Sequence, residues 1–62
     1  MPWNDSHFPR SMLHLSPIER GKAIEIANAL LAEGYDEGMA IRIAIAQAKR
    51  WASRITSESH AP

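Results

Sequence analysis

The chain has 62 residues, and its seven Lys and Arg balance its seven Asp and Glu, so the formal net charge is zero. A chain of this length holds one domain, and a hydrophobic content of 45% is too high for an intrinsically disordered protein. The lack of cysteine excludes disulfides, thiolate metal sites and a cysteine nucleophile.

Residues 1–15 are predicted to form an irregular arm, because Pro2 and Pro9 exclude a continuous helix there. One short helical turn is predicted near residues 10–14. The arm has more apolar residues than suits a free tail: Trp3, Phe8, Met12, Leu13 and Leu15. We therefore expect the arm to pack back on the rest of the chain.

A first helix is predicted over residues 16–33. Ser16 and Glu19 fit the pattern of a capping box, with a proline between them at the first helical position. Gly34 can adopt the left-handed conformation that closes a helix. The apolar residues recur at steps of three and four and form one stripe: Ala23, Ile24, Ile26, Ala27, Leu30 and Leu31. The polar residues lie mostly at its edges or outside it: Arg20, Lys22, Glu25, Asn28 and Glu33.

A second helix is predicted over residues 37–54, with Asp36 as its N-cap. The short connection that begins at Gly34 makes the two helices a hairpin. One face of the second helix is apolar, and its alanines at every fourth position allow close approach of the first helix: Ala40, Ile41, Ala44, Ile45, Ala48, Trp51, Ala52 and Ile55. The sequence thus predicts an all-α hairpin in a single domain of residues 1–55, followed by a flexible tail of residues 56–62.

The second helix has another apolar stripe, nearly opposite that face, formed by Met39, Ile43 and Ala46. A two-helix hairpin buries one side of each helix, so this stripe needs a separate cover. We expect Trp3 and Phe8 of the arm to cover part of it, and a second copy of the chain is the alternative cover.

No constellation of residues points to catalysis. The sequence has no nucleophile elbow, phosphate-binding loop or zinc-binding helix motif, and a two-helix core has little room for a pocket. His7, His14 and His60 lack the spacing of metal ligands and are interpreted as surface residues. We therefore expect a protein that is not an enzyme and has no cofactor or metal.

Membrane insertion is not expected. The first residues lack the basic and apolar regions of a secretory signal. The longest nearly apolar stretch, residues 39–48, is interrupted by Arg42 and Gln47 and is too short to cross a bilayer. The sequence favours a cytoplasmic protein.

Two classes of function remain. A small helical protein of this kind is expected to act through protein contacts, with an unknown partner or as a homodimer. The residues expected at such a surface are Trp3, Phe8, Met39, Ile43, Arg42, Lys49 and Arg50. The alternative is an accessory nucleic-acid-binding protein, because residues 39–55 contain four cations and no acid: Arg42, Lys49, Arg50 and Arg54. The zero net charge disfavours this alternative, since nucleic-acid-binding modules are usually strongly basic.

Several runs of residues resemble a family of small uncharacterised bacterial proteins. They are Met1-Pro2-Trp3, the Pro9-x-Ser11-Met12 step, the run from Lys22 to Leu31, the run from Glu33 to Gly38, Ala40-Ile41, the run from Ile43 to Ala46, and the closing Trp51-Ala52. The resemblance covers residues 1–52 and implies no activity. A weaker similarity is to ChaB, a small bacterial protein described as a regulator of cation transport. It is carried by the Met-Pro-aromatic start, the Pro-x-Ser step at residues 9–11 and an alanine-rich helix, and no function is carried over from it.

The predicted capping box generates a first test. Ser16→Ala removes the side-chain oxygen that accepts a backbone N–H in the first turn, so the free energy of unfolding should fall by about 1 kcal/mol. That is a large fraction of the stability of so small a domain. Urea unfolding of the two proteins measures the difference, and agreement within a few tenths of a kcal/mol would show that the cap does not form.

Overall fold

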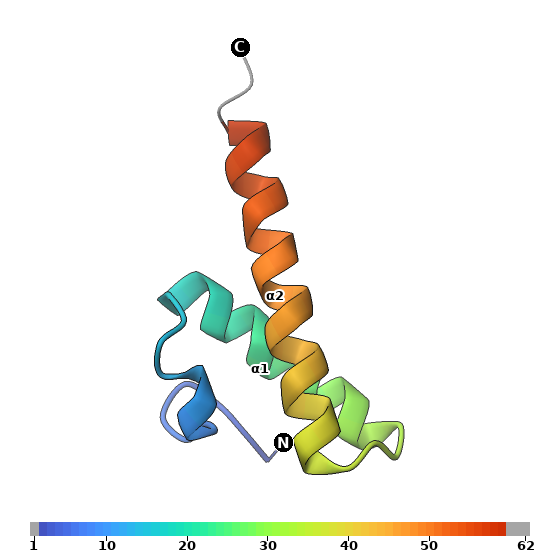
Figure 1. Ribbon diagram of the computed structural model, residues 1–62. Coiled ribbons are helices and arrows are strands. Elements are labelled where there is room, and N and C mark those ends of the chain that lie inside the picture. The colour runs from blue at the N-terminus through green and yellow to red at the C-terminus, as the bar shows by residue number, and fades with distance from the viewer. Residues whose placement is uncertain (1, 60–62) are drawn as a thin grey trace.

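The computed structural model describes residues 2–59, with side chains up to Ile55. Its helices are the 3-10 helix η1 (Arg10–Met12), α1 (Pro17–Ala32) and α2 (Glu37–Ser59). Figure 1 shows α2 crossing α1 and continuing beyond it, with the arm folded beside the pair. The extents of 41 × 22 × 16 Å follow from the length of α2, because its 23 residues rise about 35 Å. The predicted all-α hairpin, with an arm packed back on it, is confirmed.

The ends of α1 lie close to the predicted positions. Ser16 Oγ accepts the N–H of Glu19 at 3.2 Å, and the Ser16 N–H donates to Glu19 Oε1 at 3.1 Å. At the other end Gly34 has a φ of 103°, and its N–H donates to the Leu31 carbonyl at 3.0 Å. The capping box and the glycine stop are therefore both present, and both satisfy backbone groups that a helix end leaves without partners.

The start of α2 is also confirmed, since Asp36 Oδ1 accepts the N–H of Met39 at 2.7 Å. Its end differs from the prediction, because the helix continues from Arg54 to Ser59. Extending an existing helix adds one backbone hydrogen bond per ordered residue and requires no new nucleus, so apolar periodicity is not needed there. The predicted flexible tail is thus helical up to Ser59, and residues 60–62 lie outside the described residues.

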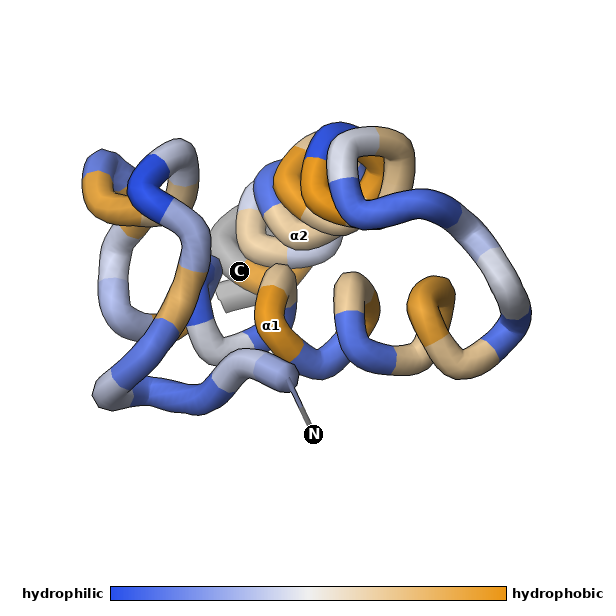
Figure 2. Tube along the Cα trace, turned by 90° about the horizontal axis from the view of Figure 1, so that it is seen from below, coloured by the Kyte–Doolittle hydropathy of each residue, from blue (hydrophilic) through white to orange (hydrophobic). Residues whose placement is uncertain are grey.

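The two helices meet through small side chains. Ala40, Ala44 and Ala48 of α2 are fully buried, as are Ala23 and Ala27 of α1. Side chains of this size let two backbones approach closely, as the spacing of the alanines predicted. Figure 2, a view from below, shows the arm and the α1–α2 connection on opposite sides of the helix pair.

The arm completes the core. Trp3, Met12 and Leu15 are buried in one cluster with the facing residues of α1 and α2, and Phe8 packs against that cluster. Met12 has no exposed surface and lies in η1, the short turn that was predicted near residues 10–14. The arm is therefore a third structural layer of this small protein.

The buried side chain of Asn28 joins the arm to α1. Its Oδ1 accepts the backbone N–H of Trp3 at 3.3 Å, and its Nδ2 donates to the Trp3 carbonyl at 3.0 Å. Asn28 is only 5% exposed, so both bonds are shielded from water. One amide thus satisfies both backbone groups of Trp3 in the interior, where an unpaired polar group is costly.

The guanidinium of Arg20 holds the second half of the arm. Its Nε donates to the Met12 carbonyl at 3.0 Å, and its Nη2 donates to the carbonyls of Leu13 at 3.0 Å and Leu15 at 2.8 Å. The same guanidinium lies 4.7 Å from the centre of the Phe8 ring. A planar group with several donors suits this arrangement, in which the chain turns between η1 and α1.

The arm does not cover the second stripe of α2, so that expectation was wrong. Met39 and Ala46 are exposed, and neither they nor Ile43 belong to the residues packed in or against the core. The reason is the position of the anchors: Arg20 and Asn28 both lie on α1 and hold the arm beside that helix. Trp3 and Phe8 are therefore part of the core and are not available to cover the stripe.

The Asn28 bonds generate a second test. Asn28→Ala removes both partners of the Trp3 backbone, so we expect the free energy of unfolding to fall by about 1–3 kcal/mol. Gln47→Ala is the matched control, because it removes an exposed amide of α2 and should change stability by less than about 0.5 kcal/mol. Urea unfolding measures both variants. Equal effects would contradict a stabilising role for the Trp3–Asn28 bonds.

Candidate functional site

The structure separates the seven residues predicted at an interaction surface into two groups. Trp3 is buried and Phe8 half-buried in or against the core, so these aromatic rings belong to the fold. The remaining residues lie along α2, where Ile43 is half-buried and the others are exposed: Met39, Arg42, Lys49 and Arg50. The predicted surface is therefore reduced to one side of a single helix.

We call this side the outer face of α2 and define it by Met39, Arg42, Ile43, Ala46, Lys49 and Arg50. Met39 is 41% exposed, and it is the large apolar side chain of this face that solvent reaches most clearly, since Ile43 is half-buried. The Nη2 of Arg42 lies 3.9 Å from the Sδ of Met39, which places a cation directly beside the apolar row. The outer face thus combines apolar and cationic side chains.

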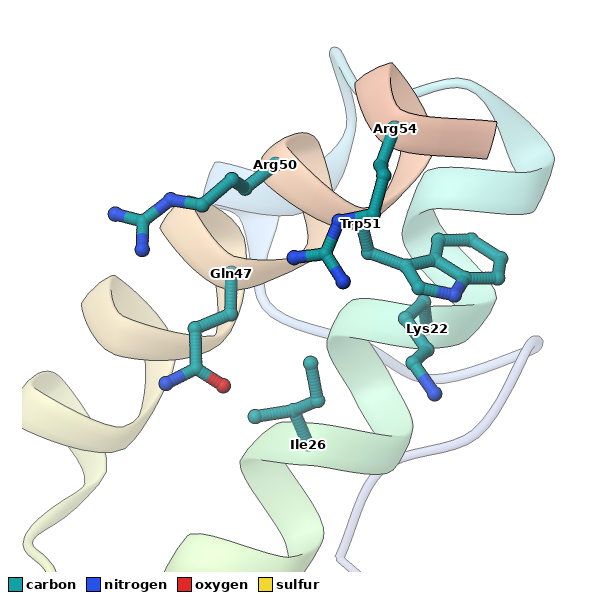
Figure 3. Close-up of a pocket in the computed structure, with 6 residues that line it drawn as sticks. All are labelled: Lys22, Ile26, Gln47, Arg50, Trp51 and Arg54. Atoms are coloured by element: carbon teal, nitrogen blue, oxygen red, sulfur yellow. The ribbon is translucent and has the colours of Figure 1, made fainter. Parts of the chain in front are cut away.

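A second surface lies where α1 and α2 cross. Lys22 and Ile26 of α1, together with Gln47, Arg50, Trp51 and Arg54 of α2, line a pocket of about 270 Å³. We call it the interhelical groove. Figure 3 shows Arg54 reaching toward the space above Ile26 and the side chain of Gln47 lying beside Ile26, whereas Arg50 extends away from them.

The charged side chains that line the groove all have the same sign. Three of its lining residues are cationic, namely Lys22, Arg50 and Arg54, and none is acidic. Lys22 Nζ lies 5.2 Å from the centre of the Trp51 ring, within the range of a cation–π contact. The same Nζ lies 2.9 Å from Glu25 Oε1, but the Glu25 side chain is 71% exposed, so this ion pair is weakened by solvent.

The interhelical groove was not predicted from the sequence. Trp51 was predicted on the buried face of the second helix and Lys22 at the edge of the first, whereas the structure brings the two into contact. The available signal was positional: Gln47, Trp51 and Arg54 follow one another at steps of four and three along one edge of α2. Which residues of the first helix lie opposite that edge depends on how the helices cross, and periodicity does not specify this.

Neither a metal site nor a membrane span is found in the described part of the chain. Its side chains include no group of three or more His, Cys, Asp or Glu that could hold a metal ion. No helix within residues 2–59 is long and apolar enough to cross a membrane. His60 lies outside the described residues.

The chain is similar to a known bacterial protein of unassigned function. It is 47% identical over 58 residues to "Uncharacterized protein YdaT" of Bacillus subtilis (strain 168), and the match covers 94% of this chain. It covers 39% of the relative, so the chain spans about two fifths of that protein's length. No family model and no solved structure matches. The similarity supports the resemblance to uncharacterised bacterial proteins, and no comparison supports the resemblance to ChaB.

Proposed function

We propose that this protein acts without catalysis, through protein contacts, and that the outer face of α2 is its contact surface. The observation that carries the proposal is the exposure of Met39 beside Arg42, in a protein whose arm is already engaged in the core. Protein interfaces combine an apolar centre with a polar rim in this way. The absence of catalytic motifs from the sequence agrees with a binding role.

A second copy of the chain is the partner that we expect on this face. Two outer faces packed together would place Met39, Ile43 and Ala46 of one copy against the same residues of the other, as in a two-fold symmetric dimer. The flanking Arg42 and Lys49 would remain at the rim, where charges stay solvated. Homodimerisation is therefore the specific form of the proposal.

Nucleic-acid binding is the second candidate function. It is favoured by one observation: Lys22, Arg50 and Arg54 line the same groove, and no acidic residue lines it. The neutral net charge of the chain limits this candidate to a local contact of few phosphates.

The dimer proposal is tested by sedimentation. The full chain at about 100 µM, far above a micromolar dissociation constant, should sediment as a dimer, and Ile43→Glu should make it monomeric because a charge would enter the apolar contact. Ile18→Glu is the matched control, since Ile18 is 69% exposed and lies at the start of α1. A monomeric full chain, or equal effects of the two variants, would contradict the proposal.

A further inference from the structure

The interhelical groove holds cations and an aromatic ring from two helices in one place. We propose that it binds single-stranded nucleic acid, with phosphates on Lys22, Arg50 and Arg54 and one base against the indole of Trp51. This inference rests on the second candidate function and assigns it to a specific site. The groove shares Arg50 with the outer face proposed for the dimer, and its other lining residues lie outside that face.

The charges of the groove favour a phosphate ligand. Arg20, the arginine of α1, donates to the carbonyls of the arm, whereas Arg50 and Arg54 of α2 make no side-chain hydrogen bond or ion pair with the other described residues. A guanidinium binds phosphate through two parallel N–H donors, and it is less strongly hydrated than an ammonium group. The groove therefore offers donors that the fold itself does not use.

The aromatic component distinguishes a nucleic acid from other anions. Trp51 is half-buried, Lys22 lies against its ring, and Arg54 lies beside it in the groove. Proteins that bind single strands combine a cationic track with aromatic rings on which bases stack. In a duplex the bases are already stacked and paired, so this contact requires an unpaired base. The groove has a volume of about 270 Å³, below the range of about 300–1,000 Å³ for sites that enclose a whole small molecule, so a strand would lie over it with one part in contact.

Trp51 itself reports on the binding. The chain has two tryptophans, and Trp3→Phe leaves Trp51 as the only one, while the bonds of Asn28 to the backbone of residue 3 are kept. A thymidine oligomer of about 12 nucleotides is titrated at about 20 mM salt, where charge screening is weak. We expect saturable quenching of Trp51, and an affinity that falls with salt as expected for two or three neutralised phosphates. Anisotropy of a labelled oligomer with the unmodified chain gives a second, independent measurement.

Matched variants assign the site. Arg50→Gln with Arg54→Gln should weaken binding about tenfold or more, because both cations line the groove. Arg42→Gln with Lys49→Gln removes the same charge from the same helix outside the groove and should weaken binding less than about threefold. Glu25→Gln frees Lys22 from its ion pair and should tighten binding about twofold. A purely structural role of these residues would not produce a gain in affinity.

The outcomes separate this inference from the function on which it rests. No binding by either measurement at about 20 mM salt overturns both the inference and nucleic-acid binding as a function. If binding falls equally in the two double variants, the groove is not the binding site, but nucleic-acid binding remains a function of the chain. A duplex that binds as tightly as the single strand overturns the contact between a base and Trp51. If polyglutamate binds as tightly as the thymidine oligomer and depends in the same way on Arg50 and Arg54, the ligand of the groove is an acidic peptide and not a nucleic acid.

Discussion

The pair of hydrogen bonds between Asn28 and the backbone of Trp3 is the interaction on which the rest of this structure depends. A hairpin of two helices in a chain of 62 residues without cysteine buries little surface, and the arm supplies the missing apolar side chains. Within the arm, backbone hydrogen bonds join Asn4 to His7 and continue through η1 to Leu15, but none of them supplies a partner for the backbone of Trp3. Asn28 and Arg20 provide partners for residues 3, 12, 13 and 15, which allows Trp3, Met12 and Leu15 to enter the core.

The position of these two anchors on α1 also determines which surfaces remain exposed. Because the arm is held beside α1, it leaves the outer face of α2 in solvent. A hairpin whose arm crossed α2 instead would bury Met39 and Ile43 and would leave α1 open. The proposed contact surface is thus a consequence of where two polar residues of the first helix lie.

The charges of this protein are balanced in total and uneven in space. Glu33, Asp36 and Glu37 gather near the connection between the helices, whereas Lys22, Arg50 and Arg54 surround the groove. The zero net charge limits the number of phosphates that the whole molecule can neutralise, but the groove keeps a local positive charge, because at physiological salt exposed charges more than about 8 Å apart are largely screened from one another. The cationic groove exists because α1 and α2 cross at the level of Lys22 and Trp51.

The sequence by itself determined the parts of this protein that depend on neighbouring residues. The capping box of Ser16, the stop at Gly34, the cap of Asp36 and the alanine contact of α2 all use groups within about four residues of one another or a simple helical period. Only the tertiary structure decided the roles of Asn28, Arg20 and the groove. Asn28 bonds to a residue 25 positions away and Arg20 to one 8 positions away, and Lys22 meets Trp51 across the two helices. A polar residue at the edge of an apolar stripe looks the same in sequence whether it faces water or a buried backbone. Its role follows from which distant segment the packing brings against it.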